Sequence, residues 1–174
     1  MEYKILFTND QIVGKVKELA GQIAEDYKDQ HPILVCVLNG GFIFFSDLSK
    51  ALWNAGLVNF EVDFVRISSY GDNKVSSGNP IMTKDVEINV QGRDVIIVDD
   101  IIETGNTPRF LIDHLSILGP SSIKLCTLLS KPLRKKDIEP DYLGFEVSPE
   151  DWVEGYGLDT ASLGRGRDCI IKRI

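Results

Sequence analysis

The stretch from Val95 to Thr107, VIIVDDIIETGNT, constrains the fold and the chemistry of this chain more than any other segment. Its first four residues are a continuous run of β-branched side chains, which is typical of a strand buried on both faces. The run ends in two adjacent carboxylates, Asp99 and Asp100. Further on, Thr107 is a suitable helix N-cap and Pro108 a suitable first helical residue. The segment therefore predicts a strand, an acidic edge, a turn of small residues and then a helix.

The acidic edge and the small-residue turn suit different parts of one ligand. The turn 104–107 offers N–H groups and hydroxyls at a helix N-terminus, which favour a phosphate. Paired carboxylates at the end of a buried strand repel each other and are costly unless a metal ion or hydroxyl donors satisfy them. A phosphorylated sugar meets both needs. The alternative is a solvated acidic loop after a strand, which a bare Asp-Asp pair would favour but the complete string does not.

Strand patterns alternate with helical patterns along the chain, which predicts a doubly wound, mainly parallel α/β sheet. In such sheets ligands bind beyond the carboxyl ends of the strands. We find no linker, repeat or low-complexity tract, so we expect a single domain over residues 1–174. Strands are predicted at 33–38, 60–67, 95–99, 123–129 and 142–147, with a closing segment at 169–174. Helices are predicted at 12–27, preceded by a capping box of Thr8 and Gln11, and at 42–55 and 108–118.

Composition excludes several classes of function. The chain has 174 residues, 43% of them hydrophobic, which is enough for a substantial core. A net charge of −7 argues against a nucleic-acid or membrane surface. The N-terminal segment MEYKILFTND lacks the features of a signal peptide, and no apolar run has membrane-spanning length, so we expect a cytoplasmic protein. Cys36, Cys126 and Cys169 lie far apart in apolar contexts, which predicts reduced thiols.

Four further segments extend the pattern over nearly the whole chain. They are VLNGGFIFFSDL at 37–48, VDFVRISSYGD at 62–72, LLSKP at 128–132 and GFEVSPEDWVEGYGLD at 144–159. VIIVDDIIETGNT resembles the phosphoribosyl-pyrophosphate (PRPP) motif of the type I phosphoribosyltransferases, and the set resembles their hypoxanthine-guanine branch. The resemblance implies that family's doubly wound fold with a small hood formed by terminal segments. It also implies transfer of the phosphoribosyl group from PRPP to hypoxanthine or guanine.

The resemblance assigns the sugar and its 5′-phosphate to the central motif. It implies that Asp99 and Asp100 hold the ribose hydroxyls, with Mg²⁺ as the cofactor that bridges these hydroxyls and the pyrophosphate. The residues implied to wrap the 5′-phosphate are Thr104, Gly105, Asn106 and Thr107.

Two other segments are implied to handle the pyrophosphate and to cover the site. Asn39 and Gly40 correspond to a turn that contacts pyrophosphate through backbone amides and often contains a cis peptide. Arg165 corresponds to an arginine that grips pyrophosphate. Ser69 and Tyr70 lie in a polar segment that resembles the family's mobile lid. A lid would exclude water from the reacting sugar.

The purine is implied to bind to three segments of the second half of the chain. Lys131 corresponds to the lysine that bonds the purine's 6-oxygen, although a lysine at a strand end normally faces solvent. Trp152 corresponds to the aromatic residue that stacks on the purine, although an isolated tryptophan more often packs in a core. Val153 would offer main-chain groups to the base, and Asp159 would reach a second Mg²⁺ directly or through a bound water.

Two positions depart from the family's pattern and leave alternatives open. Glu103 stands where the family has the aspartate that handles the proton on purine N7, and a displacement of about 1 Å can cost roughly a hundredfold in rate. Asn39 replaces a basic residue. We therefore expect a purine-salvage enzyme with small-molecule partners, in a homodimer or homotetramer. The alternatives are a nucleotide-binding regulator without turnover and a transferase with shifted preference for xanthine.

Overall fold

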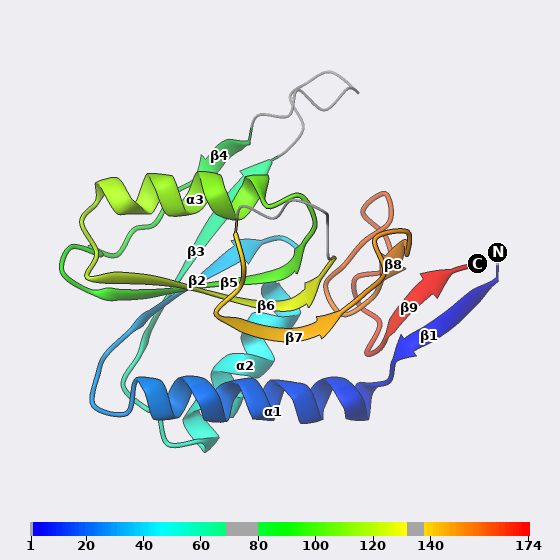
Figure 1. Cartoon of the computed structure of the whole chain (residues 1–174), viewed down its shortest axis with the longest axis horizontal. Coiled ribbons are helices and arrows are strands. Elements are labelled where there is room, and N and C mark those ends of the chain that lie inside the picture. Colours follow the sequence, from blue (N-terminus) through cyan, green and yellow to red (C-terminus); the bar gives the residue numbers. More distant parts are fainter. Residues whose placement is uncertain (1, 69–79, 132–137) are drawn as a thin grey trace.

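The computed structural model describes residues 2–68, 80–131 and 138–174, and in this part of the chain strands and helices form one large and one small sheet (Figure 1). The helices are α1 (Asn9–Asp26), α2 (Phe42–Asn54) and α3 (Asn106–Ile117). The strands of the large sheet are β2 (Ile33–Leu38), β3 (Glu61–Ser68), β4 (Ile81–Lys84), β5 (Asp94–Ile102), β6 (Ser122–Ser130) and β7 (Tyr142–Glu146). The strands of the small sheet are β1 (Tyr3–Phe7), β8 (Val153–Glu154) and β9 (Ile170–Arg173).

The large sheet confirms the predicted doubly wound architecture. Its strand order is β4-β3-β2-β5-β6-β7, with every neighbouring pair parallel except β3 and β4. Helix α3 covers one face, and α1 and α2 cover the other (Figure 1). From β2 the chain adds β3 on one side, and from β5 it adds β6 and β7 on the other. The strand order therefore reverses between β2 and β5, which is where such sheets form a ligand crevice.

Strand β5 confirms the prediction of a strand buried on both faces. The side chains of Ile96 and Val98 pack in the cluster beneath α1 and α2, whereas those of Val95 and Ile97 pack in the cluster beneath α3. All four are fully buried. Burial of one such side chain stabilises the fold by about 1.5–3 kcal/mol. This strand therefore anchors the centre of the sheet and holds the acidic residues that follow.

The small sheet is the hood that the family resemblance implies. Strand β1 pairs antiparallel with β9, so that Tyr3 lies opposite Arg173 and the two termini lie side by side (Figure 1). Strand β9 pairs in turn with β8. Strands β1, β4 and β8 are absent from our sequence-based prediction because each is short and lacks a clear alternation. No helix in the described part of the chain is both long and apolar enough to cross a membrane.

Several local predictions are confirmed. Thr8 caps α1 in a full capping box with Gln11, as its sequence pattern predicts. Helix α2 begins at Phe42 as predicted, and Gly56, at φ +96°, follows its C-cap residue Ala55. Cys36 and Cys126 are buried free thiols, and Cys169 is a half-buried one.

Two predicted boundaries around the central motif are wrong. The N-cap of α3 is Gly105, at φ +81°, and the helix begins at Asn106 rather than at Pro108 after a Thr107 cap. Glycine adopts this left-handed conformation without steric cost, so the chain turns into the helix two residues earlier. Strand β5 also continues past the two aspartates to Ile102, because its last residues still pair with β6.

Candidate active site

The two adjacent aspartates form an acidic pair at the edge of the crevice, in which Asp99 is buried and Asp100 is half-buried. Asp99 is 5% exposed, and its Oδ1 accepts a hydrogen bond from the backbone N–H of Asp100 at 2.9 Å. Burial raises the pKa of both carboxyls, and the charge of Asp100 raises the pKa of Asp99 further. The guanidinium of Arg165 acts in the opposite sense on Asp100. The pair therefore lies where a cation or hydroxyl donors would stabilise it.

The turn after β2 lies directly against this pair. The peptide bond between Leu38 and Asn39 is cis, as the family resemblance implies. A Cβ atom at Gly40 would overlap the carboxylate of Asp100, so any side chain at this position would displace that carboxylate. Helix α2 starts two residues later at Phe42, and its N-terminus therefore opens beside the acidic pair. The positive end of a helix dipole favours an anion.

The turn between β5 and α3 lies at the same edge of the sheet. The glycine N-cap of α3 has no side chain with which to bond the N–H groups of the first helical turn. The backbone N–H of Asn106 lies 3.4 Å from Oγ1 of Thr104, and both side chains are exposed. Thr107 follows within the first turn of the helix. The positive end of the helix dipole and the exposed hydroxyl of Thr104 make this turn suitable for a phosphate.

A hollow of about 210 Å³ opens beside the acidic pair. It brings together residues from β5 and its following turn, from the end of β6 and from the hood. It thus joins the predicted proton-transfer residue, the predicted purine-binding residues and one of the two aspartates. The residues that line it are Asp100, Ile101, Glu103, Lys131, Trp152, Val153, Leu158 and Asp159.

Lys131 points into this site rather than into solvent. It is 9% exposed, and its backbone N–H donates to the carbonyl of Ile102 at 2.9 Å. Its ammonium makes a short hydrogen bond and ion pair with Glu103, whose side chain is 53% exposed. The expectation that a strand-end lysine faces solvent is therefore wrong here. The pair places a donor and an acceptor side by side in the hollow.

Trp152 lies at the surface of the hollow, so the alternative of core packing is also wrong. Its side chain is 57% exposed, and its indole N–H donates to Oγ1 of Thr160 at 2.8 Å. Val153, the next residue, is 7% exposed and begins β8 of the hood. An exposed and hydrogen-bonded indole offers a flat apolar surface to a ligand.

The hood loop after β8 brings Asp159 and Arg165 together. The guanidinium of Arg165 forms an ion pair with Oδ1 of Asp159 at 2.6 Å and donates to the carbonyl of Gly157 at 2.7 Å. The backbone N–H of Ser162 donates to the other oxygen of Asp159 at 2.6 Å. Asp159 is therefore held in place at the wall of the hollow.

The carboxylates suit a metal ion that arrives with its substrate. Among residues 2–68, 80–131 and 138–174, no three His, Cys, Asp or Glu side chains gather closely enough to hold a metal ion. Asp100 and Asp159 nevertheless line the same hollow, whereas Asp99 is buried within β5. Mg²⁺ is commonly held by one or two carboxylates together with water and substrate phosphates. The donors present fit that arrangement.

Comparison with known proteins decides the family. Residues 2–160 match the family model of the phosphoribosyl transferase domain. The chain belongs to the phosphoribosyltransferase family. It is 45% identical to the hypoxanthine-guanine phosphoribosyltransferase of Streptococcus thermophilus, over 90% of this chain and 84% of the relative. It is 39% identical to the hypoxanthine-guanine-xanthine phosphoribosyltransferase of Tritrichomonas foetus, over 90% of this chain and 83% of the relative.

A solved structure agrees with this assignment. The crystal structure of a hypoxanthine-guanine phosphoribosyltransferase from Bacillus anthracis has a TM-score of 0.88 and 37% sequence identity, covering 98% of both chains. The chain is thus a phosphoribosyltransferase with the type I fold that the central motif predicts.

The predicted site residues that the structure describes lie at one edge of the sheet. Ser69 and Tyr70, predicted as part of a lid, lie outside the described residues. Ile101 and Leu158 line the hollow but are absent from the predicted set. Their apolar character carries no signal of function, although each is next in sequence to a predicted residue.

Proposed function

We propose that this phosphoribosyltransferase transfers the 5-phosphoribosyl group of PRPP to hypoxanthine and guanine, giving IMP or GMP and pyrophosphate. The observation that carries the proposal is the content of the 210 Å³ hollow, where Lys131 and Glu103 stand side by side next to an exposed indole. On a 6-oxopurine, the oxygen at position 6 and the nitrogen at position 7 are neighbours. One accepts a hydrogen bond, and the other donates one when protonated, so the pair of side chains complements this edge.

The purine would therefore enter between the two charged groups. The ammonium of Lys131 would donate to the 6-oxygen, and the carboxylate of Glu103 would accept the proton on N7. Trp152 would stack on the ring, and main-chain groups of Val153 would bond the opposite edge of the base. Lys131 and Glu103 form an ion pair with each other in the free protein. Binding of the purine would replace this ion pair by one hydrogen bond from Lys131 and one to Glu103.

PRPP would lie on the acidic edge and its two adjacent turns. Asp99 and Asp100 would hold the ribose hydroxyls. The turn 104–107 would wrap the 5′-phosphate. The backbone amides of Asn39 and Gly40 would contact the pyrophosphate, together with Arg165. Closure of a lid that contains Ser69 and Tyr70 remains a prediction from the sequence.

Mg²⁺ would be held by Asp100 and Asp159, with Asp99 supporting the neighbouring carboxylate. When bound, the ion neutralises the charge of the leaving pyrophosphate. The protein's own groups orient the two substrates: N9 of the purine faces the anomeric carbon, and Glu103 receives the proton from N7 as the new bond forms. The transition state has oxocarbenium character, as in glycoside chemistry.

The remaining partner predictions follow the family. We propose a single functional unit over residues 1–174, because the hood and the large sheet both line the hollow. We also propose a homodimer or homotetramer. Xanthine is a second candidate base, because the relative from Tritrichomonas foetus carries xanthine in its name.

A turnover assay with a panel of bases tests the proposal. Pyrophosphate release is measured with PRPP, Mg²⁺ and hypoxanthine, guanine, xanthine or adenine, for the natural chain and for Glu103→Asp and Asn39→Lys. We expect release with hypoxanthine and guanine. Release with xanthine alone would replace the proposed base preference. GMP binding without turnover, restored to turnover by Glu103→Asp, would favour a regulator instead.

A further inference from the structure

Tyr156 has a backbone conformation that few residues other than glycine adopt. Its φ angle is +50°, and its neighbours Gly155 and Gly157 are at +107° and +102°. A left-handed conformation is sterically unfavourable for a residue other than glycine. A bulky residue in this region therefore has to be held by contacts of its side chain.

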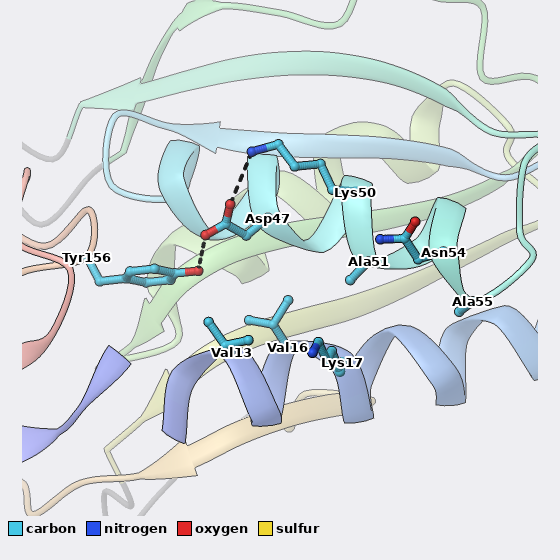
Figure 2. Close-up of a pocket in the computed structure, with 9 residues that line it drawn as sticks. All are labelled: Val13, Val16, Lys17, Asp47, Lys50, Ala51, Asn54, Ala55 and Tyr156. Carbon is cyan, nitrogen blue, oxygen red and sulfur yellow. Dashed lines mark hydrogen bonds and ion pairs between the residues drawn. The ribbon is translucent and has the colours of Figure 1, made fainter. Parts of the chain in front are cut away.

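Those contacts connect the hood with α2. The Tyr156 ring is 3% exposed, and its hydroxyl donates to Oδ2 of Asp47 at 2.7 Å. Figure 2 shows the ring reaching from the hood loop to Asp47, whose other oxygen faces Lys50 at 3.4 Å. Burial and the bond to Asp47 raise the pKa of Tyr156, so the phenol stays protonated and remains the donor.

The residue after Tyr156 links the two halves of the active site. A Cβ atom at Gly157 would overlap the carbonyl of Gly40, so the hood loop rests directly on the predicted pyrophosphate turn. The N–H of Gly157 donates to the carbonyl of Arg165 at 2.9 Å, and its own carbonyl accepts from the Arg165 guanidinium. The next two residues, Leu158 and Asp159, line the purine hollow.

Asp47 belongs to the helix that begins at this same turn. Helix α2 starts at Phe42, immediately after residues 39–41. We propose that the Tyr156–Asp47 hydrogen bond is a positioning contact, which sets the separation between the purine hollow and the pyrophosphate turn. Neither residue touches substrate in this arrangement. The inference rests on the proposed transfer reaction, in which both substrates must meet at one carbon atom.

The Tyr156–Asp47 hydrogen bond can be removed without burying an unpaired charge, because it lies beside a hollow. Tyr156 and Asp47 line a hollow of about 460 Å³ between α1 and α2, with Val13 and Val16 on its α1 side (Figure 2). The Asp47 side chain is 40% exposed. Removal of the tyrosine hydroxyl therefore leaves the carboxylate in contact with water rather than orphaned, and Tyr156→Phe is expected to fold.

Tyr142 supplies a matched control. It is 5% exposed, and its hydroxyl donates to Oδ2 of Asp26 at 2.6 Å. Like Tyr156, it joins a buried ring to a helix carboxylate. It is the first residue of β7, however, and so lies at the amino ends of the strands. The hollow lies at their carboxyl ends. Tyr156→Phe and Tyr142→Phe should lower the urea midpoint of unfolding to similar extents.

Tyr156→Phe and Tyr142→Phe should differ in catalytic activity. We expect kcat/KM for PRPP at saturating hypoxanthine to fall at least fivefold in Tyr156→Phe and less than twofold in Tyr142→Phe. Asp47→Asn keeps an oxygen acceptor and should stay within twofold of the natural chain. Asp47→Ala should match Tyr156→Phe, and the double variant should be no worse than either single change.

The outcomes distinguish this inference from the proposed function. If the natural chain turns over but both phenylalanine variants have equal activity, the positioning role is wrong. If the natural chain shows no turnover, the proposed function fails, and the GMP dissociation constants of the same two variants then test the positioning role. Equal GMP affinities would overturn it, whereas a loss confined to Tyr156→Phe would support it.

Discussion

Replacement of Lys131 by methionine tests the proposed recognition of the purine 6-oxygen, because it removes the ammonium and keeps an unbranched side chain. Lys131 is 9% exposed, so its bond to a purine would form with little competition from water. A hydrogen bond to a charged group contributes about 1.5–3 kcal/mol, which corresponds to roughly a 10- to 150-fold change in rate. We expect kcat/KM for hypoxanthine and guanine to fall by that factor.

The same change should affect stability much less. Glu103, the present partner of Lys131, is 53% exposed, and exposed ion pairs contribute about 0–1 kcal/mol. The assay compares steady-state kinetics with hypoxanthine and with unsubstituted purine, which lacks the 6-oxygen, alongside urea unfolding. Lys124→Met is the control, because Lys124 lies near the start of the same strand and pairs with Asp141 at 2.8 Å. Equal losses for both bases, or a loss shared by the control, would refute the reasoning.

Two other changes test the acidic edge and the sheet. Gly40→Ala places a methyl group on the Asp100 carboxylate, and because a displacement of about 1 Å can cost roughly a hundredfold, kcat should fall by about that factor. Gly14→Ala, with no atom within 4 Å of the new Cβ, should leave kcat unchanged and stabilise α1 by about 0.5–1 kcal/mol. Burial alone would raise the pKa of Asp63, but bonds from three backbone N–H groups outweigh it and lower the pKa. Its stabilising effect is therefore present above the unfolded pKa and lost as pH falls through the lowered folded value. Asp63→Asn should cost about 1–3 kcal/mol at neutral pH in urea unfolding, and a difference that persists unchanged at about pH 3 would contradict this account.

Patterns that depend on neighbours in sequence predicted the elements well. The β-branched run of β5 is buried on both faces, and the capping box at Thr8 begins α1 as predicted. Both signals arise from local propensity and from the periodicity of side chains. The predicted cap at Thr107 is wrong because a positive φ at Gly105 offered an earlier turn. A glycine carries no information about which of its allowed conformations the chain will adopt.

Such patterns do not predict contacts between segments that are far apart in the sequence. Nothing in the sequence around Tyr156 points to Asp47, which lies 109 residues earlier. Likewise, an isolated lysine after a strand is expected to face solvent, whereas the fold buries Lys131 at the wall of the hollow. The family resemblance supplied its predicted role, and residue types alone did not.

The sequence by itself determined the doubly wound sheet, the acidic edge and the turns beside it, because these depend on hydrophobic periodicity and on the chemistry of adjacent residues. Tertiary structure alone decided which side chains share the hollow. The hood lays Trp152 and Asp159 across the ends of strands from other parts of the chain. Burial and charge at such a site depend on what packs against a residue, and packing partners are set by the fold as a whole.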